Sequence, residues 1–117
     1  MQTALHAASP RIDAIFRALS DPTRRQVIER LSAGGASVSE LAAPHKMALP
    51  SFVEHLKVLE GAGLVHSRKA GRVRTYELMP EELRAAQTWL DRQRVIWEAR
   101  LDSLDAHLRA MKKERLE

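Results

Sequence analysis

The chain has 117 residues, and its 19 Lys or Arg against 15 Asp or Glu give a formal net charge of +4. This length fits one domain with one modest core, and a basic balance favours a polyanionic partner. The absence of cysteine excludes disulfides, thiolate zinc sites and thiol catalysis. Since no apolar run approaches the ~20 residues that span a bilayer, and no signal-peptide pattern opens the chain, we expect a cytoplasmic protein without membrane association.

The first third of the chain predicts two short helices. Residues 1–9 are expected to form a flexible tail, and residues 10–117 one domain. Pro10 suits the first turn of a helix. Its apolar face is formed by residues at helical spacing, namely Ile12, Ile15, Phe16 and Leu19. Asp21 and Pro22 then provide the N-cap and first residue of a second helix.

The next stretch predicts a helix-turn-helix. Ser37 and Glu40 have the spacing of a capping box, in which each side chain satisfies a backbone N–H of the other residue. The short helix behind them stops at Pro44, and a second helix covers residues 49–62 with Pro50 in its first turn. Its expected inward face consists of Leu49, Phe52, Val53, Leu56 and Leu59. In such a motif the second helix enters the major groove of DNA.

A basic hairpin follows. Residues 65–78 predict two antiparallel strands with a tight turn at Ala70-Gly71. Four cations crowd around that turn, namely Arg68, Lys69, Arg72 and Arg74. Like charges repel one another unless a polyanion neutralises them, and the phosphates of a duplex would do so. The alternative is an edge hairpin whose charges only prevent aggregation.

The outer face of the second helix offers candidate base contacts beside Pro50. Ser51 and His55 can hydrogen-bond a base edge or a phosphate, and Glu54 can accept from a cytosine amino group. Lys57 lies toward the flank and suits a phosphate. By themselves these residues favour an ordinary solvated surface, so the basic hairpin is the stronger indication of DNA binding.

The rest of the chain predicts one long helix over about residues 81–113. Large apolar residues recur at every seventh position, namely Leu83, Leu90, Trp97, Leu104 and Met111. A stripe packed only on the chain's own N-terminal helix is one interpretation. A helix that spans ~45 Å favours a seam between two copies. The expected dimer interface comprises Ile12, Ile15, Phe16, Leu90, Trp97, Leu101, Leu104 and Leu108.

Enzyme and metal chemistry find little support in the sequence. Phosphate-binding loops, nucleophile elbows and metalloprotease motifs are absent. Asp105 and His107 are a faint metal-site pattern, but side chains two residues apart on a helix diverge by roughly 200°. We therefore expect no catalytic residues, no metal and no cofactor.

Taken together, these segments resemble the ArsR/SmtB family of bacterial winged helix-turn-helix transcriptional repressors. The resemblance runs from Ile15 to about Leu108. It is carried by ALSDPTRRQVIERL (18–31), SELAAPHKMALPSFVEHLKVLEGAGLV (39–65) and RKAGRVRTYEL (68–78). It implies a mostly α fold with a two-stranded wing, dimerised through its N- and C-terminal helices. It also implies double-stranded DNA as the partner, a palindromic operator, and relief of repression by an effector of unknown identity.

The chain departs from the family pattern at three places. It lacks the cysteines of metal and persulfide sensors, and it lacks the second histidine pair that would complete a metal site with Asp105 and His107. Val53 and Glu54 stand where many members carry Ser followed by Lys or Arg, a change that should weaken phosphate contact. Glu54 also supports an alternative function, a winged helix that docks an acidic protein. The hairpin cations and the seam favour DNA.

Overall fold

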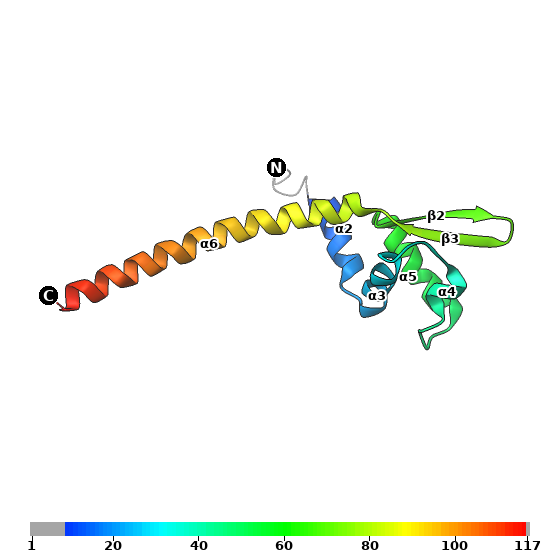
Figure 1. The fold of residues 1–117 in the computed structure, drawn as a ribbon, viewed down its shortest axis with the longest axis horizontal. Helices are drawn as coiled ribbons and strands as arrows, with labels where there is room; N and C mark the ends of the chain where they lie inside the picture. The colour runs from blue at the N-terminus through cyan, green and yellow to red at the C-terminus, as the bar shows by residue number, and fades with distance from the viewer. Residues whose placement is uncertain (1–8, 117) are drawn as a thin grey trace. The chain divides into compact units, whose positions relative to one another are not determined.

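A computed structural model describes residues 9–116, which form five helices and three strands (Figure 1). In chain order these are α2 (Ser9–Leu19), α3 (Pro22–Leu31), β1 (Ala36–Ser37), α4 (Val38–Ala42), α5 (Leu49–Gly61), β2 (Val65–Ala70), β3 (Val73–Leu78) and α6 (Pro80–Leu116). The predicted mostly helical fold with a hairpin wing is confirmed. The predicted tail lies outside the described residues, except for Ser9, which begins α2.

The chain divides into two compact units, residues 1–86 and 87–117. Within the described residues, the first unit holds α2 to α5, the sheet and the beginning of α6. The second unit is the remainder of α6. The helix extends three residues beyond the predicted end of the pattern, and its terminal charges suit the helix dipole, with Glu81 and Glu82 in the first turn and Lys113 and Arg115 in the last.

The core lies entirely within the first unit. Its largest fully buried side chains are Phe52, Ile15, Leu41, Leu56, Leu59, Leu64, Val27 and Val65. They come from all the helices of this unit before α6, from Leu64 just before β2 and from the first residue of β2, as the apolar periodicity predicts. Leu49 is a correction, because its side chain is 56% exposed rather than inward-facing. It is the first residue of α5, where the periodicity continues but no neighbouring element covers the helix end.

Local hydrogen bonds fix where the helices begin and end. Asp21 accepts from the Arg24 backbone N–H at 3.0 Å, which caps α3. The predicted capping box is confirmed, because the Glu40 N–H donates to Ser37 Oγ at 3.2 Å and the Ser37 N–H donates to Glu40 Oε1 at 2.9 Å. Beyond α5, Gly63 adopts a φ of 77°, and a Cβ there would lie 3.0 Å from the Glu82 side chain. Glycine is therefore required at this position.

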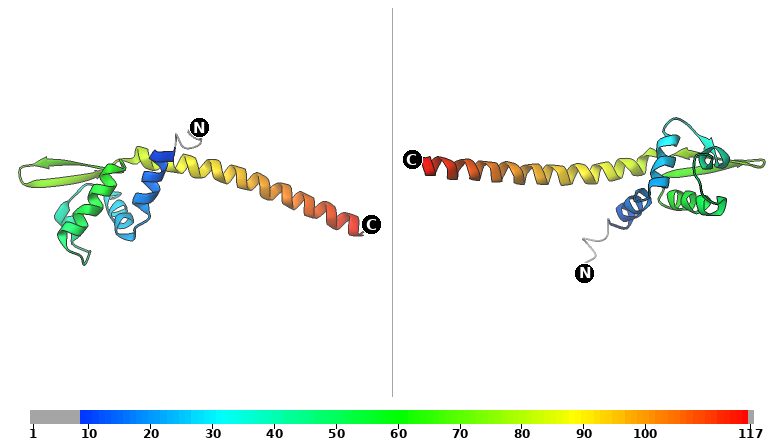
Figure 2. Two further views of the ribbon diagram at one scale, coloured as in Figure 1. Left: turned by 180° about the vertical axis from the view of Figure 1, so that it is seen from behind. Right: turned by 90° about the horizontal axis from the view of Figure 1, so that it is seen from below.

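The three strands form one antiparallel sheet in the order β1-β3-β2. Ala36 of β1 pairs with Tyr76, and Ala70 of β2 pairs with Val73 across the hairpin. The turn is therefore Gly71-Arg72 rather than the predicted Ala70-Gly71, and Gly71 supplies the positive φ of 64° that its first position needs. The sequence did not predict β1, since two residues carry no periodicity. Figure 2 shows β2 and β3 projecting beyond the helices α2 to α5.

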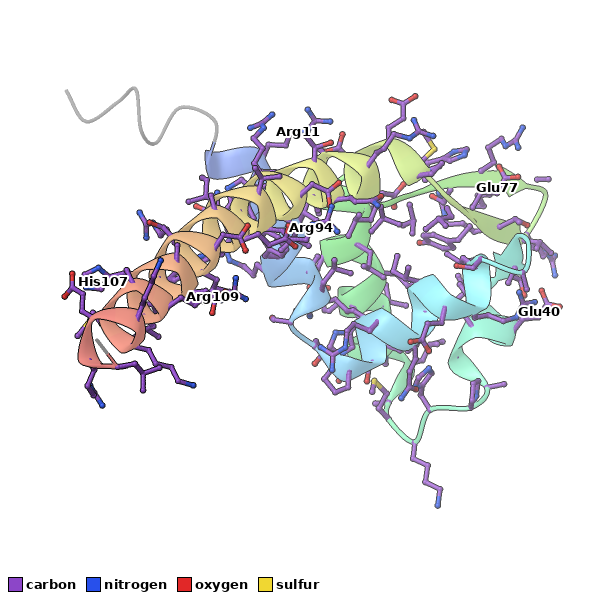
Figure 3. All side chains as sticks on the ribbon, turned by 60° about the vertical axis from the view of Figure 1, so that its left-hand side comes forward. Arg11, Glu40, Glu77, Arg94, His107 and Arg109 are labelled. Atoms are coloured by element: carbon purple, nitrogen blue, oxygen red, sulfur yellow. The ribbon has the colours of Figure 1, made fainter. Side chains whose placement is uncertain are left out.

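A bidentate ion pair ties the beginning of α6 to α2. Arg11 Nε donates to Glu82 Oε2 at 2.7 Å, and Arg11 NH2 donates to Glu82 Oε1 at 2.8 Å. Figure 3 labels Arg11 at this position. The hydrogen bond from Arg11 holds the pKa of the Glu82 carboxyl below its ordinary value. A fork-to-fork pair of this kind fixes direction as well as distance, so it orients the first turn of α6 on the domain.

Candidate nucleic-acid interface

Helix α5 presents most of the predicted recognition residues to solvent. Pro50, Ser51, Glu54 and Lys57 are all exposed on it. Lys57 Nζ lies 3.2 Å from Glu54 Oε2, one turn along the helix. Such a surface pair contributes little stability, but the lysine offsets the acidic charge that would otherwise face phosphate.

His55 lies differently from these residues. Its side chain is only 22% exposed and leans on α3, where its Nδ1 is 3.0 Å from Arg24 NH1 and 3.7 Å from Asp21 Oδ2. No local sequence pattern predicts this contact, because Arg24 lies 31 residues before His55. The structure therefore brings a helix-capping aspartate, an arginine and a recognition-helix histidine together.

The four wing cations are not equivalent. Arg68 NH2 donates to Glu77 Oε1 at 2.7 Å, and this hydrogen bond holds the pKa of the Glu77 carboxyl below its ordinary value. Arg74 NH1 donates to Ser67 Oγ at 2.8 Å. Among the described residues, the side chains of Lys69 and Arg72 make no hydrogen bond or ion pair. Their charges are therefore the ones most available to a polyanion.

A cleft of about 470 Å³ lies between α5 and the wing. Four of its lining residues are cations, namely Lys57, Lys69, Arg72 and Arg74, and Glu60 of α5 is the single acidic one. Val38, Val53 and Tyr76 contribute apolar surface to the same cleft. Sequence reasoning predicted the helix and the wing cations separately, but their convergence needs the fold. An anion held in this cleft would meet positive charge from both elements.

Two apolar side chains near the beginning of α5 were missed. Met47, in the turn before the helix, is 37% exposed, and Leu49 is 56% exposed. Residues at the N-terminal end of a recognition helix approach base edges, and apolar side chains there can meet a thymine methyl group. Periodicity could not find them, because it assigns every apolar residue at that spacing to the core.

Neither a metal site nor a membrane span emerges from the described part of the chain. Within residues 9–116, no group of three or more His, Cys, Asp or Glu side chains is arranged to hold a metal ion. Asp105 Oδ2 instead lies 2.9 Å from Arg109 NH2 on its own helix. Among the described helices, none is long and apolar enough to cross a membrane.

The predicted seam residues on α6 are open to solvent in the single chain. Large apolar side chains, each about half exposed, follow one stripe, namely Leu90, Trp97, Leu101, Leu104 and Leu108. Arg94 lies between them and is paired with Asp91 at 3.4 Å and Glu98 at 3.9 Å (Figure 3). In α2, Ile12 and Phe16 are half-buried against the core. Ile15, predicted for the interface, is 0% exposed and fills the core of its own chain.

Comparison with known proteins places these features in a family. A family model described as a helix-turn-helix domain matches residues 19–68. The HTH-type transcriptional regulator Rv2034 of Mycobacterium tuberculosis is 46% identical over 80 residues, which cover 68% of this chain and 75% of that protein. A crystal structure of an ArsR family transcriptional regulator is 49% identical, with a TM-score of 0.74, over 76% of this chain and 92% of that one.

A third relative bears on assembly. The solution structure of the homodimeric winged helix-turn-helix DNA-binding domain Mb0332 of Mycobacterium bovis is 26% identical, with a TM-score of 0.62. The likeness covers 84% of this chain and 87% of that one. Together, the fold and the basic cleft define a winged helix-turn-helix DNA-binding transcriptional regulator. The chain belongs to the ArsR family of these regulators.

Proposed function

We propose that the protein acts as a homodimeric repressor that binds a palindromic operator through α5 and the wing of each chain. The observation that carries this proposal is the cleft in which Lys57 of α5 meets Lys69, Arg72 and Arg74 of the wing. A duplex backbone that follows this cleft would neutralise cations that otherwise repel one another and would release counterions. A dimer seated on an operator would then block access to the promoter DNA it covers.

The roles within each half-site follow from exposure. Ser51 and Leu49, near the start of α5, are placed for base edges, and Pro50 sets the helix entry between them. Lys57, Lys69 and Arg72 are placed for phosphates, which fix the register of the protein on the duplex. Arg68, already paired with the Glu77 carboxylate, acts mainly to shape the wing, whereas Arg74, held by the neutral Ser67 hydroxyl, keeps its charge for the cleft. His55 contributes through its contact with Arg24.

The dimer proposal rests on the exposed stripe of α6. Along a helix of this length, so large and so regularly spaced a set of apolar side chains is not expected to stay exposed to water. The set comprises Leu90, Trp97, Leu101, Leu104 and Leu108. Val95 and Ile96 are also exposed, at 62% and 46%, and they lie on another face of the same helix. Residues around 95–97 are therefore apolar on more than one side, which favours a partner that covers α6 from two directions.

One observation favours a second candidate function. Glu54 is 69% exposed in the middle of the proposed groove-facing surface, and an acid there suits a protein partner better than phosphate. That partner would have to be acidic elsewhere to engage the wing. Against this alternative, the Lys57 ammonium group lies beside Glu54 and offsets it.

Salt dependence separates the two candidates. If the dimer contacts about 6 to 10 phosphates, its affinity for duplex DNA falls by roughly 10³ to 10⁵ between 50 and 200 mM salt. Fluorescence anisotropy with labelled genomic duplexes measures this slope. A response that is flat, or an absence of duplex binding at 50 mM salt, would contradict the repressor proposal and support protein docking.

The remaining parts of the proposal are simpler. DNA binding makes or breaks no covalent bond, so we propose that the regulator has no enzymatic activity. We also propose that it is located in the cytoplasm with its operator. Relief of repression by an effector stays a prediction of the family resemblance. An operator duplex, used to screen small molecules for release of the protein, is the measurement that tests it.

A further inference from the structure

Arg24 joins three elements of the domain. Its Nε donates to the Ala18 carbonyl at 2.7 Å and its NH2 to the Arg17 carbonyl at 3.0 Å, so the guanidinium caps the C-terminal end of α2. Its backbone N–H is held by Asp21 Oδ2 at the start of α3. The remaining NH1 lies 3.0 Å from Nδ1 of His55 on α5. Because two other bonds fix the guanidinium, its direction toward the histidine is fixed as well.

This contact selects one form of the histidine. A guanidinium offers only donors and keeps its proton, so Nδ1 of His55 must accept the hydrogen bond. An accepting Nδ1 belongs to the neutral ring that carries its proton on Nε2. Asp21 Oδ2 faces the same Nδ1, but at 3.7 Å it is too far for a competing hydrogen bond. Arg24 therefore holds His55 in its Nε2–H tautomer.

An Nε2–H group of fixed direction can hydrogen-bond only to acceptor atoms on the base edges of the major groove. His55 follows Ser51 by one turn of α5, and its ring is partly exposed. Its Nδ1 is already hydrogen-bonded to Arg24, so Nε2 is the ring nitrogen that can bind DNA. Adenine and guanine both present an N7 acceptor there, thymine presents an O4 acceptor beside its methyl group, and cytosine presents an amino donor. A ring that can only donate therefore matches a purine N7 or a thymine O4 and is mismatched with cytosine.

We propose that Arg24 is a positioning residue for base recognition. It orients His55 so that Nε2 donates to the N7 of one purine in each half-site. The inference rests on the proposed DNA-binding function and names the chemistry of one contact within it. Arg24 itself touches no base in this account, and its effect on specificity passes through the histidine.

The tautomer can be measured in the protein without DNA. In the full chain labelled with ¹⁵N-histidine, a long-range ¹H–¹⁵N spectrum should show His55 as the Nε2–H form, with the signal assigned by its loss in His55→Asn. Arg24→Ala should convert this signal to a mixture of forms. Arg25→Ala is the matched control, because Arg25 NH1 also donates to an α2 carbonyl, that of Leu19 at 2.8 Å. A wild-type Nδ1–H form would overturn the inference.

The base contact is tested on a duplex enriched by selection. Replacement of each purine in turn by its 7-deaza analogue should weaken wild-type and Arg25→Ala binding by about 3- to 10-fold at one purine per half-site. His55→Ala and Arg24→Ala should bind the unmodified duplex and the duplex with a 7-deaza purine at that position with equal affinity. His55→Asn retains an acceptor facing Arg24 and should keep the fold, so it separates loss of the base contact from loss of packing.

The outcomes separate this inference from the proposal beneath it. A selection that enriches no sequence contradicts the operator proposal, while the tautomer spectrum still decides whether Arg24 positions His55. An enriched duplex on which wild type and His55→Ala respond identically to every 7-deaza purine contradicts the base contact alone. Should Arg24→Ala fail to fold, Arg24→Lys keeps the charge but lacks the fork that reaches two carbonyls and the histidine together, and it should give the same loss.

Discussion

The domain that ends at Ala86 and the helix that continues from Gln87 obtain their structure in different ways. All the side chains in the core cluster, from Ile15 to Ala86, lie in the first unit. Of the 37 residues of α6, Ala86 alone is buried among those described. Beyond it, Trp97, Leu101 and Leu104 are each more than half exposed. The domain is completed by its own chain, whereas we propose that a second chain covers the apolar stripe on the helix.

This difference assigns separate tasks to the two regions. The domain holds a recognition helix and a wing in fixed geometry, so its substitutions should change folding or the contact with DNA. We propose that the helix sets how many such surfaces act together, so its substitutions should change association first. Variants in either region can therefore break or sharpen the division.

The largest effect is expected for Leu104→Glu on the α6 stripe. If Leu104 is buried between two chains, the substitution places two unpaired charges in one seam and costs about 6 kcal/mol per dimer, or more than four decades in the dimer dissociation constant. Sedimentation velocity at micromolar concentration measures the change. Ala106→Glu, also on α6 but off the stripe, is the control and should remain dimeric. A dimeric Leu104→Glu chain would contradict the seam.

The converse variant is Phe52→Ala in the domain. Phe52 is fully buried, so its truncation should lower the free energy of unfolding by about 3 to 5 kcal/mol through lost burial and a residual cavity. Urea unfolding followed by circular dichroism gives this value. The nearby Val58→Ala, at a side chain that is 39% exposed, should cost far less. Equal losses in the two variants would show that α5 does not pack as described.

A smaller effect is expected for Arg72→Ala. Because Arg72 has no partner within the described chain, its removal should weaken binding to specific and non-specific duplexes alike, by about 1 kcal/mol, and should reduce the salt slope by about 1. Arg68→Ala is the matched wing control, since its charge is already paired with Glu77. Anisotropy titrations at several salt concentrations compare them. A greater loss for Arg68→Ala would reverse the assignment of wing roles.

The smallest effect concerns acid stability of the domain. The hydrogen bond from Arg11 lowers the pKa of Glu82, and the Ser37 backbone N–H lowers that of Glu40, each from an ordinary value of 4.5. A carboxyl group whose pKa is lowered by folding stabilises the fold at a pH above its pKa in the unfolded chain. This contribution is lost as the pH falls through its pKa in the folded chain. Melting temperatures should therefore drop below about pH 4.5, and Glu82→Gln should show a shallower drop. If the wild type and Glu82→Gln showed the same dependence of melting temperature on pH, the Arg11–Glu82 pair would not contribute to acid stability.

Much of the domain was predictable because its signals are local. The Asp21 cap, the Ser37–Glu40 box, the end of α5 and the hairpin each depend on residues a few positions apart. The wing turn was predicted one residue too early, because glycine can occupy either the first or the second position of a two-residue hairpin turn. β1 was missed because two residues have no period, and Leu49 because periodicity cannot report whether a neighbour covers a helix end.

The candidate site was less predictable because its contacts join distant segments. The wing charges were visible in the sequence, but their division into paired Arg68 and unpaired Arg72 depends on cross-strand neighbours. The contact between Arg24 and His55 joins α3 to α5 and has no sequence signature. The stripe on α6 was predicted as a dimer seam from its spacing, and that assignment stays a prediction.

The most direct test of the central claim is selection of bound duplexes by the purified full chain, followed by sedimentation of the complex. If α5 and the wing of two chains act together, the enriched sequence should be an inverted repeat whose half-site centres lie about 10 to 10.5 base pairs apart, or a multiple of this spacing. The complex should contain two chains per duplex. A single unsymmetrical site bound at full affinity by one chain would contradict the account.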